Sequence, residues 1–299
     1  MRRTGAVVML ALFAAVANPP ARASITVTDD AGQTLTLAAP AQRIVSLAPH
    51  ATELLFAAGA GDRVAGVSAF SDYPPPVRAL PQISGGVRLD IEQVLALKPD
   101  LAVGWSSGNA SSDLDALRRF GIPVFIAEPK KLDDLPATLL SLGRIAGRET
   151  EAQAAAEQYR ARLATLRADY RERTPVRVFV MISARPLMTL NYAHLLQDVL
   201  RLCGGRNIFA ARDTLAPTVS YESVLIEDPD VILFSSSLGT ASALRDWWRE
   251  RVDLRAVRSG HVYSVPADTT LRQTPRVLEG TAKVCEALDA ARQSRAPLR

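Results

Sequence analysis

The chain is poor in the residues that build metal and redox centres. Its 299 residues include two cysteines and three histidines, and the cysteines do not form a CxxC motif. A cysteine zinc site or a dithiol redox centre is therefore not expected, and three scattered histidines do not make a zinc site. The sequence also has no P-loop, no GxGxxG and no HExxH motif. We therefore expect a protein that is not an enzyme and needs no cofactor or resident metal.

Excess charge and long apolar runs are also scarce. Lysine plus arginine number 35 against 31 acidic residues, and the first 23 residues hold three of the arginines and no acid. Beyond them the balance is 32 against 31, or +1, which is too small for a nucleic-acid-binding face. After residue 23 each apolar run is interrupted by charge, glycine or proline within about 10 residues, and a membrane-spanning helix needs about 20.

The N-terminus has the order of a secretory signal. Arg2 and Arg3 precede the apolar run Ala6–Ala17, and Ala21-Arg22-Ala23 follows two prolines. A charged start, a short apolar run and small residues at the end are typical of a cleaved signal peptide. We predict a signal peptide over residues 1–23, cleavage after Ala23 and export to the periplasm; an uncleaved anchor is the alternative.

Export makes the two cysteines informative. Cys203 and Cys285 both lie in the second half of the chain. In an oxidising compartment an even pair favours a disulfide, so we expect these two residues to be bonded. Two buried thiols are the alternative.

The chain contains an internal repeat. The segment Glu92–Val103 matches Glu222–Leu233 without gaps at an offset of 130, sharing Glu, Val-Leu and Pro-Asp at the same spacing. Each copy reads as a short helix, a Pro-Asp turn and a buried parallel strand. Phe120–Ile126 and Ser259–Val265 repeat more loosely, each a glycine turn into a strand. Alternating helices and strands predict an α/β fold in each half.

A long uninterrupted helix is expected between the two halves. Thr150–Arg173 has no glycine or proline, and Thr150 with Gln153 fits a capping box. An apolar stripe recurs at helical spacing, which favours a rigid connection with limited opening; an ordinary surface helix of the second lobe is the alternative. The predicted domains are a signal peptide (1–23), an N-terminal lobe (24–148), a linker helix (149–173) and a C-terminal lobe (174–299).

Four further segments carry a family resemblance. Arg43–Gly59, Ser71–Pro74, Leu97–Leu101 and Leu202–Phe209 resemble periplasmic binding proteins for metal chelates, and among these the cobalamin binders of ABC importers. The resemblance covers Arg43–Ala291. It implies an α/β protein of two Rossmann-like lobes joined by one long helix, with the ligand in a cleft between them. It also implies a monomer that delivers a corrinoid, such as cobalamin, to an ABC permease in the inner membrane.

The resemblance also gives a role to the first residue of each repeat. Relatives dock on arginines of a two-fold symmetric permease through one surface glutamate per lobe, and Glu92 and Glu222 match those positions. Equivalent carboxylates on similar lobes suit a symmetric partner. The alternative is a pair of solvated acids in the first turn of a helix, where negative charge is favourable in any case.

The ligand site is expected to combine flat aromatic groups with a few polar ones. The resemblance implies that Phe70 and Trp105 face the ligand, and Tyr73 lies in the same segment as Phe70. It also places Asp268 and Arg272 in a second-lobe loop near the corrin side chains, where Asp268 would accept from amide NH2 groups and Arg272 would donate to amide carbonyls. Core packing for the aromatics, and a local surface pair for Asp268 and Arg272, are the alternatives.

Departures from the cobalamin pattern keep other ligands open. Positions that are often aromatic in the relatives hold Gly86, Ile182 and Ala216, and Tyr192 and Tyr221 are candidates to compensate. A haem ligand would need an axial donor, for which the candidates are His50, Tyr73 and Tyr192. His50 is expected in the loop before a helix that begins near Thr52, and a neutral loop residue bonded to the backbone is the favoured interpretation. A ferric siderophore would need cationic anchors such as Arg272 and Arg206, and a ligand-free interaction module is a third reading.

Overall fold

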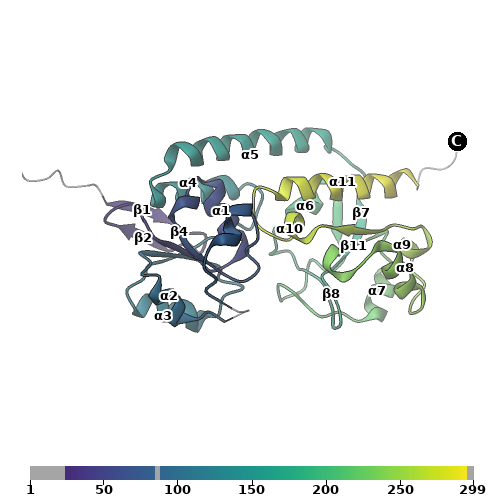
Figure 1. Cartoon of the computed structure of the whole chain (residues 1–299). Helices are drawn as coiled ribbons and strands as arrows, with labels where there is room; N and C mark the ends of the chain where they lie inside the picture. Colours follow the sequence, from purple (N-terminus) through teal and green to yellow (C-terminus); the bar gives the residue numbers. More distant parts are fainter. Residues whose placement is uncertain (1–23, 85–87, 295–299) are drawn as a thin grey trace, which may run out of the picture.

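Two four-stranded parallel sheets form the centres of two α/β lobes (Figure 1). The computed structural model describes residues 24–84 and 88–294, so the expected signal peptide and Gly86 lie outside the described residues. The N-terminal sheet has the order β4-β3-β5-β6 and the C-terminal sheet the order β10-β7-β11-β12. The strands are β3 (Ile44–Ser46), β4 (Val64–Val67), β5 (Leu101–Gly104), β6 (Val124–Ile126), β7 (Val176–Met181), β10 (Gly205–Asn207), β11 (Val231–Ser235) and β12 (Val262–Val265).

Helices cover both faces of each sheet, as the nearly continuous apolar character of the strands requires. In the N-terminal lobe one face carries α1 (Pro49–Ala57) and α4 (Leu135–Ala146), and the other carries α2 (Ile91–Ala96) and α3 (Ser111–Arg119). The second lobe repeats this arrangement. One of its faces carries α6 (Leu196–Leu202) and α11 (Val277–Gln293), and the other carries α7 (Tyr221–Glu227), α8 (Ala241–Arg249) and α9 (Arg255–Arg258).

Smaller elements complete each lobe. An antiparallel hairpin precedes the first sheet, a second hairpin follows β7, and one short helix precedes α11. Three 3₁₀ turns lie in connecting segments. These elements are β1 (Ile25–Thr28), β2 (Thr34–Leu37), β8 (Ser183–Ala184), β9 (Leu187–Met188), α10 (Ala267–Thr270), η1 (Gly61–Arg63), η2 (Pro75–Ala79) and η3 (Ser236–Leu238).

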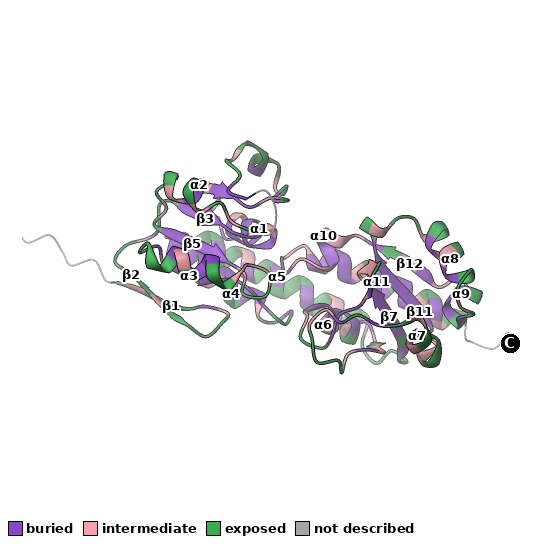
Figure 2. Cartoon of the chain, turned by 90° about the horizontal axis from the view of Figure 1, so that it is seen from below, coloured by how far each residue is buried: buried purple, intermediate pink, exposed green. Residues whose placement is uncertain are grey.

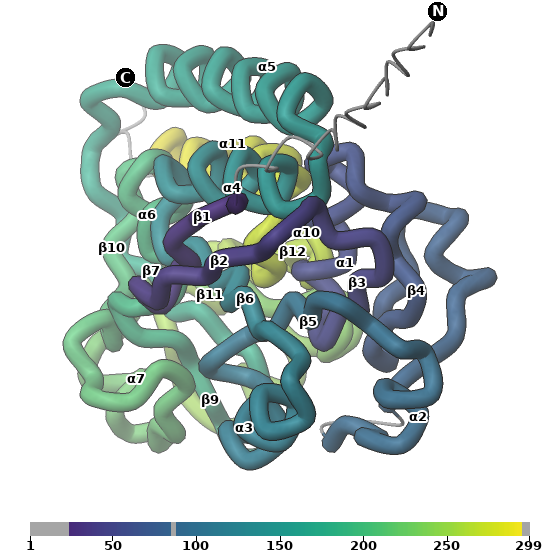
Figure 3. Tube along the Cα trace, turned by 90° about the vertical axis from the view of Figure 1, so that its left-hand side faces the viewer, coloured from purple at the N-terminus to yellow at the C-terminus, as the bar shows by residue number. Residues whose placement is uncertain are grey.

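One long helix, α5 (Glu149–Asp169), runs over both lobes (Figures 1 and 3). Tyr159 and Leu163 of its apolar stripe are buried in a hydrophobic cluster that continues from the N-terminal lobe into the C-terminal lobe. The burial colours of Figure 2 show this apolar interior in both lobes. The helix therefore does not span an empty gap but shares a core with both lobes. Within the described chain, none of the helices has the length and apolar character of a membrane crossing.

The expected N-terminal cap of α5 and its C-terminal end differ from the prediction. The helix starts at Glu149, after Arg148, and the residue at its N-cap makes no side-chain capping bond. Thr150 therefore lies inside the first turn, and the expected capping box with Gln153 is wrong. The helix ends at Asp169, four residues before the predicted Arg173. The chain must straighten there to enter β7, and Pro175 disfavours helical conformation in the residue before it.

The internal repeat is a structural repeat. In the N-terminal lobe the Asp100 carboxylate accepts from the backbone amides of Gln42 (2.7 Å) and Arg43 (3.0 Å), at the start of the neighbouring strand. In the C-terminal lobe Asp230 accepts from the Arg177 amide at 2.8 Å. In both lobes the arginine side chain also donates to a backbone carbonyl at the end of the short helix before the Pro-Asp turn. Arg43 donates to Leu97, and Arg177 donates to Glu227. The Pro-Asp turn thus ties two parallel strands together in the same way twice.

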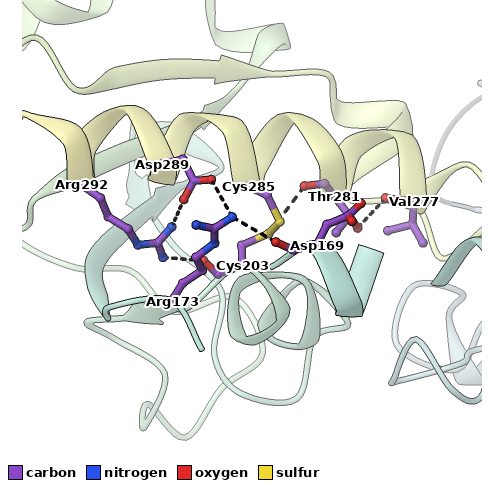
Figure 4. Close-up of a disulfide and its surroundings, with 8 residues drawn as sticks. All are labelled: Asp169, Arg173, Cys203, Val277, Thr281, Cys285, Asp289 and Arg292. Carbon is purple, nitrogen blue, oxygen red and sulfur yellow. Dashed lines mark hydrogen bonds and ion pairs between the residues drawn. A yellow bond between two sulfur atoms is a disulfide. The ribbon is translucent and has the colours of Figure 1, made fainter. Parts of the chain in front are cut away.

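The expected disulfide is confirmed. Cys203, at the end of α6, bonds Cys285 in α11, with the two Cα atoms 4.7 Å apart (Figure 4). Both cysteines are fully buried. Arg292 of α11 donates to the Cys203 carbonyl and, at 2.7 Å, to the Thr174 carbonyl. The bridge therefore joins the two helices that cover one face of the C-terminal sheet.

Candidate functional site

The two candidate docking glutamates occupy equivalent positions. Glu92 and Glu222 are each the second residue of a short helix, α2 and α7, and both are exposed. Each helix is capped by the side chain just before it, Asp90 accepting from Gln93 and Ser220 from Ser223. Figures 1 and 3 place α2 and α7 at the ends of the lobes opposite α5. The two short helices that carry the glutamates therefore lie on the same side of the molecule.

Hydrogen bonds favour the charged form of Glu222. Bonds from the backbone amide of Glu222 itself and from the Ser220 side chain hold the pKa of Glu222 below its usual value. Negative charge at the start of a helix is also favoured by the helix dipole. Glu222 is thus ionised at neutral pH.

An ion-pair network joins the two lobes. Arg272, which follows α10 of the C-terminal lobe, donates at 2.9 Å to Glu53 of α1 and at 2.9 Å to Asp72 in the N-terminal lobe. It also pairs with Asp268 of its own lobe at 2.9 Å and donates to the Phe70 carbonyl at 3.3 Å. The predicted pair of Asp268 and Arg272 is therefore one part of a larger network that crosses between the lobes.

A second arginine extends this network. Arg276 pairs with Glu53 at 3.3 Å, and its guanidinium lies over the Tyr73 ring, 3.9 Å from the ring centroid. Tyr73, Pro275 and Arg276 line a hollow of about 320 Å³ at the flank of the lobe junction. Tyr73 thus lies beside a cation that covers one face of its ring, while the residue as a whole stays 42% exposed.

The aromatic candidates differ in exposure. Phe70 is 75% exposed, and it adopts a left-handed backbone conformation with φ of 65°. Tyr192, from the opposite lobe, is 69% exposed. Trp105 is partly buried and meets the His50 ring edge to face, with the ring centroids 5.1 Å apart. Phe70 and Tyr192 therefore offer open aromatic surface, whereas Trp105 has part of its surface packed.

The remaining candidates contribute little open aromatic surface. Tyr221 packs against Trp247 and Trp248 in the C-terminal lobe, with ring centroids 5.6 and 5.9 Å away. Ile182 and Ala216 are both partly buried against the hydrophobic core. Arg206 is exposed in β10. Tyr221 is accordingly a packing residue and does not compensate for the missing aromatics.

His50 lies in the first turn of α1 and not in a loop before it. Its Nε2 is 2.9 Å from the Ala127 carbonyl oxygen, and burial lowers its pKa to about 4. The favoured interpretation, a neutral histidine bonded to the backbone, is confirmed. Burial likewise lowers the pKa of His194, in the opposite lobe, to about 4, so both imidazoles are uncharged at neutral pH.

A buried carboxylate follows the strand β6. Glu128 is 7% exposed and accepts hydrogen bonds from the hydroxyl of Ser106 and, at 3.3 Å, from the Ser107 amide. Burial pushes its pKa up, but these hydrogen bonds outweigh burial and hold the pKa of Glu128 below its usual value. Glu128 therefore adds a negative charge to the region between the lobes.

One catalytic motif escaped the sequence analysis. Gly104-Trp105-Ser106-Ser107-Gly108 has the GxSxG spacing of a hydrolase nucleophile, directly after β5. Ser106 donates to the Glu128 carboxylate, and in the described part of the chain it has no histidine partner. A serine nucleophile needs a base to take its proton, and an ionised carboxylate held by several donors is a weak one. The motif here forms a turn that anchors Glu128.

Sequence analysis also missed Glu53, Arg276 and Glu128. The signal for Glu53 was present, because it is the one charged residue in the apolar helix Pro49–Ala57. Glu128 also carried a signal, because it follows the apolar strand Val124–Ile126 at its carboxyl end. Arg276 carried none. Over residues 24–84 and 88–294, no three His, Cys, Asp or Glu side chains converge in a way that could hold a metal ion.

Comparison with known proteins agrees with this architecture. The model of the periplasmic binding protein family matches residues 44–269. The vitamin B12-binding protein of Vibrio cholerae is 38% identical over 255 residues, covering 85% of this chain and 91% of the relative. The crystal structure of the periplasmic vitamin B12 binding protein of Vibrio cholerae has a TM-score of 0.78 at 39% identity, covering 85% of this chain and 99% of that one.

A haem binder shares the fold at lower identity. The periplasmic haem-binding protein of Roseiflexus sp. RS-1 has a TM-score of 0.74 at 27% identity and covers 84% of this chain and 98% of its own. The architecture is therefore shared by proteins with different ligands, and it is the architecture expected from the sequence. This chain belongs to the periplasmic binding protein family.

Proposed function

We propose that this chain binds cobalamin between its two lobes and delivers it to an ABC permease. The observation that carries the proposal is the 38% identity to a vitamin B12-binding protein over nine-tenths of that relative's length. The inter-lobe residues support it. Phe70 supplies open aromatic surface, and Asp268 and Arg272 supply an acceptor and a donor for peripheral amides.

Calorimetric titration tests the ligand. The chain starting at Ser24 is titrated with cyanocobalamin and, separately, with haemin. We expect one-to-one binding of cyanocobalamin, weakened about tenfold or more in Phe70→Ala, because large aromatics dominate such contacts. Phe120→Ala is the matched control, since Phe120 is also an exposed phenylalanine (60%) but lies at the end of α3. No heat and no spectral change with cyanocobalamin at micromolar protein would refute the proposal.

Haem is the second candidate, because haem-binding proteins share the fold. The candidate axial ligands differ in availability. The Nε2 atom of His50 is engaged by the Ala127 carbonyl, which counts against His50. A tyrosine would bind the iron through its phenol oxygen, and both Tyr73 (42% exposed) and Tyr192 (69% exposed) have exposed side chains. A haemin titration without a sharp Soret shift would exclude haem as the ligand. If neither cyanocobalamin nor haemin binds, a ferric siderophore or a ligand-free interaction role becomes the hypothesis to test.

The permease contact is proposed to involve Glu92 and Glu222. Their equivalent helix positions, their exposure and their common side of the molecule support docking on a two-fold symmetric partner. Transport assays with Glu92→Lys and Glu222→Lys test this. We expect normal ligand affinity with impaired uptake in each variant, and normal uptake by the double variant would refute the assignment. Glu157→Lys, on the exposed face of α5, is the control.

Export is proposed to depend on residues 1–23. The family is periplasmic, and the charged and apolar order of this segment supports a cleaved signal. Intact mass measurement of protein recovered from the periplasm tests the cleavage site. A first residue other than Ser24 would correct it, and retention in the membrane fraction would favour an uncleaved anchor. The protein is proposed to act as a monomer, which sedimentation of the same sample checks.

A further inference from the structure

The ion-pair network between the lobes holds more carboxylates than guanidinium groups. Arg272 contacts Glu53, Asp72 and Asp268, each at 2.9 Å. Arg276 contacts Glu53 at 3.3 Å. Two cations therefore face three carboxylates, and both guanidinium groups are engaged by the protein itself.

Glu53 holds the two arginines in place. Its side chain is 2% exposed, and it accepts from both of them. Burial raises its pKa, while the hydrogen bond from Arg272 and the charge of Arg276 oppose that rise. If either arginine turned away to meet an anionic ligand, it would leave a buried carboxylate poorly paired, which is strongly unfavourable. The arginines are therefore not free to serve as anion anchors.

The surroundings of the network do not reverse this balance. Glu128 adds a buried negative charge, and it lies close enough to His50 and His194 to act on both electrostatically. Those two imidazoles are neutral at pH 7, as described above. Arg78, which acts on Asp72 from the flank, has an exposed side chain. With Arg78 and Glu128 included, three cations face four carboxylates.

We propose that this carboxylate excess makes the inter-lobe site discriminate against chelates that present a carboxylate to the network, with Glu53 as the residue that sets the discrimination. The inference rests on the proposed function and narrows its ligand class to chelates that present neutral amides to this network. A primary amide can accept from Arg272 and donate to Asp72 or Asp268, so both members of each ion pair keep a partner. A carboxylate can only accept, and it must approach like charges.

A pair of nearly isosteric ligands tests the proposal. Cyanocobalamin is compared with its monocarboxylic acid, in which one peripheral carboxamide is hydrolysed and one negative charge is added. We expect the wild-type chain to bind cyanocobalamin on the order of tenfold more tightly, the size of one like-charge contact near a protein surface. The ratio of the two affinities should be smaller in Glu53→Gln, because this variant keeps an acceptor oxygen but removes the buried charge.

Two further variants keep the test decisive. Asp72→Asn removes an exposed charge from the network and should narrow the preference even if Glu53→Gln does not fold. Asp115→Asn removes an equally exposed carboxylate paired with Arg118 on α3, and it should leave the preference unchanged. Equal affinities for the two ligands in the wild-type chain, or an unchanged preference in both network variants, would overturn this inference and leave the proposed function standing. Failure of the wild-type chain to bind cyanocobalamin would overturn both.

Discussion

The sheets of the two lobes have the same architecture, but the contacts that stabilise their outer layers differ. Both have the same strand order, and both tie the two central strands with a Pro-Asp turn. The N-terminal lobe adds the hairpin β1–β2, from which Asp29 accepts from the Ile126 amide (3.1 Å) and Asp30 accepts from the Glu128 amide (2.7 Å). The C-terminal lobe instead has the disulfide between Cys203 and Cys285. The repeat thus defines the sheets, and each lobe stabilises its outer layer by different chemistry.

The largest difference should come from the disulfide. Replacing Cys203 and Cys285 by serine frees a loop with a sequence separation of 82, and we expect the unfolding free energy of the C-terminal lobe to fall by about 4 kcal/mol. Tryptophan fluorescence reports this lobe alone in a Trp105→Phe background, because Trp247 and Trp248 both lie in α8. Reductant should reproduce the loss in the parent protein and have no effect on the serine variant. A chemical denaturation midpoint that does not move would show that the bridge is dispensable.

The next largest effect is a pH dependence to which each lobe contributes one histidine. The pKa of His50 and of His194 is lowered to about 4, against about 6.5 in an unfolded chain. Between these values the unfolded state binds a proton that the folded state does not, so stability is complete above about pH 6.5 and falls as the pH drops. Each histidine should contribute a loss of about 3 kcal/mol at pH 4.

The N-terminal lobe has an opposing group. Burial raises the pKa of Asp30 to about 6, so this carboxyl favours the folded state at low pH and loses that contribution as the pH rises from about 4 to 6.

The histidine contributions are measured by urea unfolding between pH 4 and 7. The free energy of unfolding should rise less steeply with pH in His50→Gln and in His194→Gln than in the parent chain, because each variant lacks one histidine whose pKa is lowered by folding. Identical slopes in all three proteins would contradict neutral buried imidazoles.

The repeated aspartates should differ by a smaller amount. Asp230 is 3% exposed and is also paired with Arg255 at 3.0 Å, whereas Asp100 is exposed. We expect Asp230→Ala to lower the unfolding free energy by about 3 kcal/mol, as for a broken buried pair, and Asp100→Ala by about 1 kcal/mol. Denaturant titration of both variants measures the difference. Equal losses would mean that burial does not distinguish the two turns.

The repeat also shows what sequence reading could supply. The match between Glu92 and Glu222 predicted the helix, turn and strand in both lobes, because proline and aspartate end a helix at a defined place. The equivalence of Arg43 and Arg177 was missed because their offset is 134, and an ungapped alignment at 130 cannot find it. The capping box of α5 was predicted wrongly because Thr150 and Gln153 match only a local pattern, whereas the helix begins at Glu149 and places Thr150 inside its first turn.

The candidate site was harder to predict than the fold. Arg272 was expected to face the ligand, but its partner Glu53 is 219 residues away in the sequence. No periodicity or spacing links two positions that meet only when the lobes come together. For His50 the bond to the backbone was predicted correctly, but its place was not, because it lies in the first turn of α1 and not in the loop before it.

The smallest predicted difference concerns two equivalent residues with left-handed backbone conformation. Lys98 has φ of 47° and Asp228 has φ of 34°, and both stand before the Pro-Asp turn. Glycine relieves a strain of about 1–2 kcal/mol there but loses about 0.5–1 kcal/mol of chain entropy, so Lys98→Gly should stabilise the chain by about 0.5 kcal/mol. Lys98→Ala, which removes the side chain but keeps the strain, should give no gain.

The same change in the other lobe should have the opposite sign. The Asp228 carboxylate accepts from the Arg255 amide at 2.8 Å and pairs with the Arg255 guanidinium at 3.0 Å. Asp228→Gly relieves the backbone, a net gain of about 0.5 kcal/mol, but removes both contacts, each worth about 1 kcal/mol. It should therefore destabilise the chain by about 1.5 kcal/mol. Thermal unfolding of the two glycine variants measures both signs. If both variants were stabilised, the Asp228 contacts with α9 would contribute nothing, and the two turns would be energetically as well as geometrically equivalent.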